Sequence, residues 1–264
     1  ISGYLIQKSY QKSNKNRINH KIEDNQKIAN FGSITKFITI NSFNDGSCKV
    51  CLQYDIEKSQ FCVTKTHYKD SYGFKLINRE LQNYKKLKHP LFPSFYDYIE
   101  ENDQLYFVIE YIHGKTLDHF DPSNYKENEI INIIFEIMIS IHYIHSNGYI
   151  YRDLKPSNII IDSNKTAVLI DFDSMIKSDS VNENSTMDFV HCYISPEICH
   201  GKLFTNKTDI YSFGLIVKNK FLNKNISDEI LSKLKIMCKY CIKENPDERP
   251  TISQLIRYFY LNIL

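Results

Sequence analysis

The sequence predicts an α+β fold in two parts, a sheet part with one helix followed by a mostly helical part. Three observations support this. Five strand-like runs separated by turn residues occupy the first half, one helical run lies among them, and helical periodicity dominates after Gly114. With 264 residues and 42% hydrophobic content, the chain can bury one core or the cores of two closely packed lobes. The natural cleft of such a molecule lies between its two parts.

The elements follow from alternating or helical spacing of apolar residues between turn signals. We expect strands at residues 35–43, 48–54, 61–67, 95–100 and 104–111, and one helix at 72–87. In the second part we expect helices at 127–147, 208–221, 226–242 and 251–260, with a short hairpin at 159–162 and 167–170. Residues 1–33 are polar and weakly periodic, which indicates an N-terminal extension before a folded domain at 34–264.

Composition excludes several classes of function. Lys plus Arg number 33 against 31 Asp plus Glu, so there is no electrostatic reason to expect a nucleic-acid partner. The most apolar stretch, 130–144, contains Asn132, Glu136 and His142, so we expect a core helix there and no membrane insertion. Seven cysteines in a chain of this length indicate an intracellular, cytoplasmic or nuclear setting. The Cys-x-x-Cys pairs lie in a strand-like run and in a distant helical run, which argues against zinc.

The most informative run is residues 151–158, Tyr-Arg-Asp-Leu-Lys-Pro-Ser-Asn, followed after an apolar stretch by Asp-Phe-Asp at 171–173. Asp and Asn are common in turns, but this set at this spacing between apolar runs is specific. It resembles the catalytic loop and metal-binding motif of eukaryotic-type protein kinases of the Ser/Thr type. The resemblance implies a bilobal protein kinase fold, with an N-lobe at 34–112 and a C-lobe at 113–264.

Phosphoryl transfer needs a carboxylate for the substrate hydroxyl, oxygen ligands for Mg²⁺ and cations near the phosphates. The resemblance implies ATP and Mg²⁺ as cofactors and a protein substrate. It assigns Asp153 as the base and Lys155 as a cation near the transferring phosphate. Asn158 and Asp171 are the expected magnesium ligands.

The resemblance also implies a nucleotide-binding set. Residues 62–65, Cys-Val-Thr-Lys, resemble the strand whose lysine reaches the α and β phosphates, with Glu80 as the partner of Lys65. Residues 107–112 resemble the hinge, where backbone groups of Glu110 and Ile112 contact adenine. Val50 and Gly46 belong to the expected phosphate loop.

Two further motifs concern the structure and regulation of the C-lobe. Glu197, in Ser-Pro-Glu at 195–197, is expected to pair with Arg249 in a structural ion pair. Serine and threonine residues in the segment after Asp171 are candidate phosphorylation sites that would pair with Arg152. These candidates are Ser174, Ser178, Ser180, Ser185 and Thr186.

The sequence departs from the family pattern in four places. Aligned without a gap, the three glycine positions of the phosphate loop hold Phe43, Asp45 and Cys48, and with a one-residue gap only Gly46 fits. The loss of glycines predicts weaker ATP binding. Asp173 replaces a glycine, and would be strained if that position requires a positive φ. Phe-Val at 189–190 replaces Gly-Thr. The interval from 209 to 249 is short, which predicts the loss of a substrate-docking helix.

Three functions fit these observations. The retained polar set favours an active Ser/Thr protein kinase. The altered phosphate loop motivates a pseudokinase, a nucleotide-binding or scaffold module that regulates a protein partner. A small-molecule kinase of similar fold is the third reading, but Ser-Pro-Glu at 195–197 argues for a protein substrate.

Overall fold

The computed structural model describes residues 36–45, 48–68, 72–181, 192–222 and 225–264. The predicted extension at 1–33 lies outside these residues, as do Gly46, Ser185, Thr186 and the Phe-Val pair at 189–190. Every structural statement below concerns the described part of the chain.

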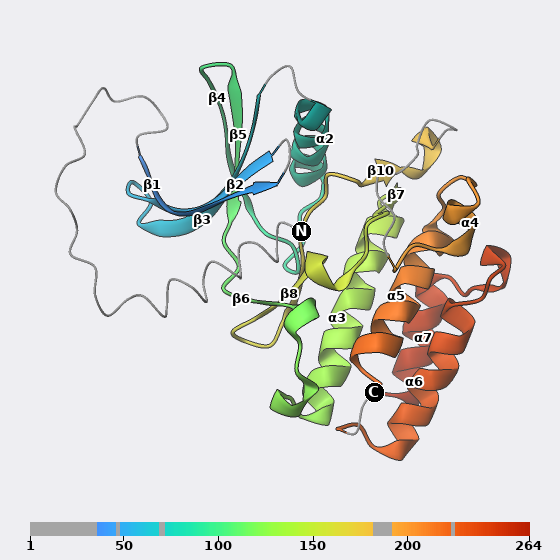
Figure 1. Cartoon of the computed structure of the whole chain (residues 1–264). Helices are drawn as coiled ribbons and strands as arrows, with labels where there is room; N and C mark the ends of the chain where they lie inside the picture. The colour runs from blue at the N-terminus through green and yellow to red at the C-terminus, as the bar shows by residue number, and fades with distance from the viewer. Residues whose placement is uncertain (1–35, 46–47, 69–71, 182–191, 223–224) are drawn as a thin grey trace.

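The N-terminal part is an antiparallel five-stranded sheet with one helix beside it (Figure 1). The strand order is β1-β2-β3-β5-β4. Its elements are β1 (Phe37–Asp45), β2 (Cys48–Asp55), β3 (Gln60–Tyr68), α2 (Tyr72–Lys86), β4 (Phe95–Glu101) and β5 (Gln104–Glu110). The β4–β5 turn places Asn102 and Asp103 at φ 50° and 58°, a conformation that these two residue types tolerate well.

Helix α2 presents one apolar face to this sheet. Ile77, Leu81 and Tyr84 recur at helical spacing and are all at most 3% exposed. The helix packs on β3 and β5, and Lys85 and Lys86 lie in its last turn, where a cation is favourable. This packing sets the position of Glu80 relative to the sheet.

The C-terminal part is mostly helical, with short strands near the junction of the two parts (Figure 1). Its helices are α3 (Glu127–Ser146), α4 (Pro196–Cys199), α5 (Asn206–Lys220), α6 (Asp228–Cys241) and α7 (Ile252–Asn262). Its strands are β6 (Gly114–Thr116), β7 (Tyr149–Ile150), β8 (Ile159–Asp162), β9 (Ala167–Leu169) and β10 (Ile176–Lys177). Strands β6, β8 and β9 form one small sheet, and β7 pairs with β10.

Helix α3 lies in the centre of this part and packs against α5, α7 and β9. It ends before Gly148, whose φ of 76° is a left-handed conformation that favours glycine. Helices α5 and α6 approach each other at Gly214. A Cβ at this position would lie 2.5 Å from the Cβ of Cys241, so only glycine allows the approach.

The connection between α5 and α6 is short. Its described residues, 221–222 and 225–227, form no helix. Asn225 Nδ2 donates to the carbonyl of Pro122 at 2.7 Å, and the Ser227 N–H donates to Glu127, which ties the connection to the start of α3. No additional helix is therefore inserted in the described part of this connection, as the short interval in the sequence predicted.

The expected α+β class and the bilobal arrangement are confirmed. In the described part of the chain, no helix combines the length and the apolarity that a bilayer crossing requires.

Candidate active site

The loop that carries Asp153 is held in place from α5. Asp209 accepts hydrogen bonds from the backbone N–H groups of Tyr151 and Arg152, both at 2.9 Å. His145 Nε2 lies 2.8 Å from the same carboxylate. Arg152 adopts a φ of 75°, an uncommon conformation for a residue with a side chain, and these bonds help hold it there. Asp209 therefore positions the backbone on which Asp153 is displayed.

Asp153, Lys155 and Asn158 form one network. The Asp153 carboxylate is buried, and its Oδ2 accepts from Lys155 Nζ at 2.6 Å and from Asn158 Nδ2 at 2.9 Å. Asn158 Nδ2 also donates to the Asp153 backbone carbonyl at 2.9 Å. The short 3₁₀ helix Pro156–Asn158 brings the three side chains together. The network holds one carboxylate oriented beside one cation.

Asn158 retains an unused acceptor. Its side chain is fully buried, and Oδ1 has no hydrogen-bond donor among the described residues. An orphaned buried amide oxygen is costly unless something binds it. A hard cation such as Mg²⁺ prefers oxygen ligands of this kind, so the donor chemistry of Asn158 fits the expected metal. The Ile170 N–H donates to the Asn158 carbonyl at 2.9 Å, which joins this loop to the residue before Asp171.

Lys65 projects from β3 between two carboxylates. Its Nζ lies 2.8 Å and 3.0 Å from the two Glu80 oxygens and 2.8 Å from Asp171 Oδ1. Burial opposes the lysine charge, but Asp171 and Glu80 outweigh it and raise the Lys65 pKa well above its ordinary value. The cation is therefore held firmly between α2 and the strand end at Asp171.

The two partners of Lys65 differ in how they respond to burial. Burial raises the pKa of Glu80 to about 7, although Lys65 acts in the opposite direction. For Asp171, burial also acts to raise the pKa, but Lys65 prevails and the pKa lies below its ordinary value. Asp171 is thus the carboxylate that stays ionised most readily, as a metal ligand must.

The condition under which Asp173 would be strained, a positive φ at its position, is not met. The residue with a positive φ is Asp171, at 68°, and Asp173 is absent from the positive-φ positions. The replacement of glycine by Asp173 therefore carries no left-handed penalty in this conformation. The Asp173 side chain is half-buried and accepts from Ser174 Oγ at 2.9 Å. Burial and the neighbouring Asp171 raise its pKa to about 6.

An aromatic column connects the two parts of the molecule through Phe172. The Phe172 ring lies 4.8 Å from Tyr84, 4.9 Å from Phe92 and 5.9 Å from Tyr151, measured between ring centroids. Tyr84 in turn lies 5.2 Å from Phe107 on β5. Sequence reasoning missed this column. Its one sequence signal was an aromatic residue at position 84, one helical turn after Glu80.

An apolar pocket adjoins Lys65 on the side of the predicted hinge. Its walls come from β3, β5 and the small sheet of the C-terminal part, and Ile112 is one of the residues that line it. They are Val63, Lys65, Pro93, Ile109, Glu110, Tyr111, Ile112, Ile160, Ile170 and Asp171. The Glu110 N–H already donates to the Ser94 carbonyl at 2.9 Å, so this backbone donor is occupied within the protein. Most of the lining is apolar, as suits an aromatic base, but the pocket's volume in this conformation is only about 30 Å³.

The expected phosphate loop differs from a flexible glycine turn. The β1–β2 ladder continues to Asp45 opposite Cys48, so positions 43, 45 and 48 belong to paired strands. Val50 is 1% exposed and lies opposite Lys65, but it does not line the pocket. Gly46 lies outside the described residues.

The structural ion pair expected in the C-terminal part is present. Arg249 Nη1 and Nη2 donate to the two Glu197 oxygens, each at 2.7 Å, and the arginine side chain is fully buried. The guanidinium also lies 4.8 Å from the Tyr211 ring. Arg152, the expected partner of a phosphorylated residue, lies 4.2 Å from the Phe204 ring. Of the candidate phosphorylation sites, Ser174, Ser178 and Ser180 are described and the other two are not.

Comparison with known proteins decides the family. Residues 44–230, which include the loop and the Lys65 cluster, match the sequence profile of the protein kinase domain. The chain belongs to the protein kinase domain family.

Relatives of this kinase domain are named as serine/threonine-protein kinases. The serine/threonine-protein kinase PrkC of Bacillus subtilis is 32% identical over 200 residues, which are 73% of this chain and 31% of PrkC. The serine/threonine-protein kinase nekl-2 of Caenorhabditis elegans is 26% identical over 80% of this chain and 69% of its own length. Mouse Nek1 is 24% identical over 88% of this chain and 20% of its own length. The kinase domain therefore spans about a third of PrkC and a fifth of Nek1.

Proposed function

We propose that this kinase domain transfers the γ-phosphate of ATP to serine and threonine hydroxyls of protein substrates. The observation that carries the proposal is the oriented Asp153 carboxylate, bonded to Lys155 and Asn158 and anchored through Asp209. Its expected partners across the cleft, Lys65 and Asp171, lie 2.8 Å apart. Relatives named as serine/threonine-protein kinases support the same acceptor class.

The residues would divide the work as follows. Asp153 orients the acceptor hydroxyl and takes its proton as the oxygen–phosphorus bond forms and the bond to the ADP oxygen breaks. Lys155 neutralises charge on the transferred group, and Lys65 holds the remaining phosphates. Asn158 Oδ1 and Asp171 would hold Mg²⁺, which would neutralise charge on the phosphates.

We also infer an intracellular setting, cytoplasmic or nuclear. All seven cysteines are free, and Cys51, Cys62, Cys238 and Cys241 are buried in the core. Free thiols in such number are typical of reducing compartments. A regulatory protein partner and an N-terminal extension outside the folded domain remain parts of this proposal.

The test is the chemical identity of the acceptor. The purified chain is incubated with Mg²⁺ and γ-labelled ATP, together with three peptides that differ only in carrying Ser, Thr or Tyr. We expect label on the Ser and Thr peptides. Label on the Tyr peptide alone would overturn the Ser/Thr assignment. Absence of label across many acceptor proteins, despite measurable ATP binding, would instead support the pseudokinase reading.

A further inference from the structure

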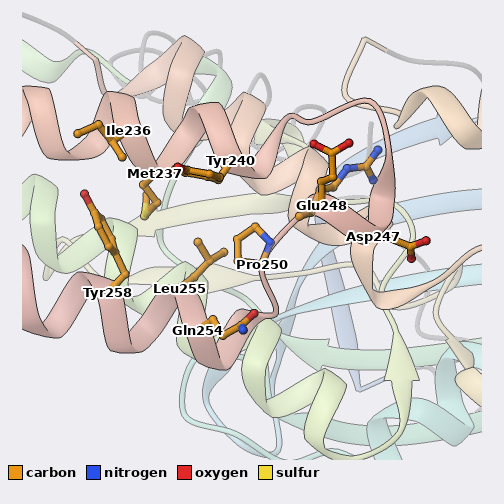
Figure 2. Close-up of a pocket in the computed structure, with 10 residues that line it drawn as sticks. Ile236, Met237, Tyr240, Asp247, Glu248, Pro250, Gln254, Leu255 and Tyr258 are labelled. Carbon is orange, nitrogen blue, oxygen red and sulfur yellow. The ribbon is translucent and has the colours of Figure 1, made fainter.

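A groove on the C-terminal part lies between α6 and α7 (Figure 2). Its volume is about 370 Å³. Met237 and Leu255 form a buried floor, while Ile236 and Tyr240, one turn apart on the same face of α6, are 49% and 53% exposed. Large apolar side chains exposed together on one side of a groove mark a surface suited to a partner. We call this surface the α6–α7 groove.

One end of the α6–α7 groove is acidic. Figure 2 shows Asp247 and Glu248 at the opposite end from Ile236 and Tyr258. Glu248 pairs with Lys243 at 3.3 Å, and both side chains are exposed to solvent. Among the residues that line the groove, Arg249 is the cationic one. Its side chain is fully buried and forms an ion pair with Glu197. The groove therefore offers apolar surface followed by two carboxylates, of which Glu248 is paired with Lys243.

We propose that the α6–α7 groove binds residues 1–17 of the same chain. This segment lies outside the described residues, but its sequence complements the groove in order and in charge. Tyr4, Leu5 and Ile6 form an apolar cluster, and Lys8 and Lys12 follow it. The segment adds Lys15 and Arg17 and contains no acidic residue. The apolar cluster would cover Ile236 and Tyr240, while the lysines approach Asp247 and Glu248.

The chain is long enough for this contact. Residues 18–35 connect the segment to Lys36 at the edge of the sheet, and 18 extended residues span up to roughly 60 Å. A folded domain of this size is roughly 45 Å across. The segment can therefore reach a groove on the helical part, although it begins from the sheet part. This contact goes beyond the proposed catalytic function and does not depend on it.

The test uses photocrosslinking in the full chain. Tyr240 is replaced by benzoylphenylalanine, the protein is irradiated, and crosslinked peptides are identified by mass spectrometry. We expect crosslinks to residues 1–17. The matched control carries the same substitution at Tyr260 on α7, which is 68% exposed and does not line the groove. Crosslinks to other segments, or equal crosslinking from Tyr260, would overturn the proposal.

Two further experiments test whether the bound segment comes from the same chain and whether charge pairing contributes to its binding. In an equal mixture of ¹⁵N-labelled and unlabelled chains, crosslinks should stay within one isotope, whereas mixed pairs would assign the groove to a second copy. Asp247→Lys with Glu248→Lys should lower the crosslinked fraction roughly five-fold, as should Lys8→Glu with Lys12→Glu. Combining all four substitutions should restore the yield, and failure to restore it would contradict the proposed pairing.

Discussion

At the scale of single residues, the unusual feature of the site is the number of carboxylates around one lysine. Glu80 and Asp171 contact Lys65 directly, and Asp173 adds a third negative group nearby. Burial and Asp171 together make the ionised form of Asp173 unfavourable, which is why its pKa is raised to about 6. The nucleotide-free protein should be sensitive to the charge of this one side chain.

Asp173→Asn should therefore stabilise the nucleotide-free protein at neutral pH. The native pKa of about 6 exceeds the ordinary value of 3.8, so between these values the native state binds more protons than the unfolded state. The free energy of unfolding then falls as pH rises from about 4 to about 6. The full displacement corresponds to roughly 3 kcal/mol, and partial exposure reduces the expected gain at pH 7 to about 1–2 kcal/mol. The free energy of unfolding of both proteins is measured by urea denaturation in EDTA from pH 4.5 to 7.5. The same pH dependence in the wild type and in Asp173→Asn would refute the prediction.

Removing the hydroxyl should have opposite effects on stability at two buried tyrosines. Tyr84 OH has no hydrogen-bond partner among the described residues, whereas Tyr151 OH donates to the Ile170 carbonyl at 2.5 Å. Tyr84→Phe keeps the ring contacts and should stabilise the protein by about 1 kcal/mol, because an unpaired buried hydroxyl is costly. Tyr151→Phe should destabilise it by about 1 kcal/mol, because a carbonyl loses its donor. Chemical denaturation of both variants tests the pair, and equal effects of the same sign would contradict it.

At the scale of elements, α4 and α5 are fastened to the loop before α7 by Arg249. Besides Glu197, its guanidinium donates to the backbone carbonyls of Lys207 and Glu244, at 2.9 Å and 3.0 Å. Such a planar, bidentate arrangement is specific to arginine. The pair orders the region that follows the undescribed residues 182–191.

Arg249→Lys should lower the free energy of unfolding by about 3–5 kcal/mol, because lysine cannot bridge both Glu197 oxygens and leaves a buried carboxylate poorly paired. Arg257→Lys on α7 is the matched control, since Arg257 is exposed, and should change stability by less than about 0.5 kcal/mol. Urea denaturation compares the two. Similar losses from both substitutions would show that the Glu197 contact is not what matters.

The longer elements could be predicted from the sequence, and so could the short hairpin of β8 and β9, but the other short strands could not. All five strands of the main sheet and helices α2, α3, α5, α6 and α7 lie within a few residues of their expected positions. Strands β6, β7 and β10 were missed because two or three residues carry no detectable periodicity, whereas the three-residue β9 was expected as half of an apolar hairpin. The sequence could say only that Asp173 would be strained if its position required a positive φ; the residue with a positive φ is Asp171, at 68°.

At the scale of the whole molecule, the sequence identified the polar residues of the site but not the frame that holds them. The Lys65–Glu80 contact and the Asp153 network bring together residues that the family resemblance had paired, and their roles stay predictions. The aromatic column through Phe172 could not be predicted, since its rings come from distant segments that only the fold unites. The column contacts α2, β5 and the loop that carries Asp153, so it packs the two parts of the molecule together beside the site.

Asp153 is proposed to act as the base in phosphoryl transfer, and one comparison tests this role most directly. Transfer of labelled γ-phosphate from Mg-ATP is measured for the wild type and for Asp153→Asn, each with its melting temperature. We predict transfer by the wild type and a fall of about 10²-fold or more in Asp153→Asn, with little change in melting temperature. Equal transfer by both proteins, or none by a folded wild type that binds ATP, would contradict the account.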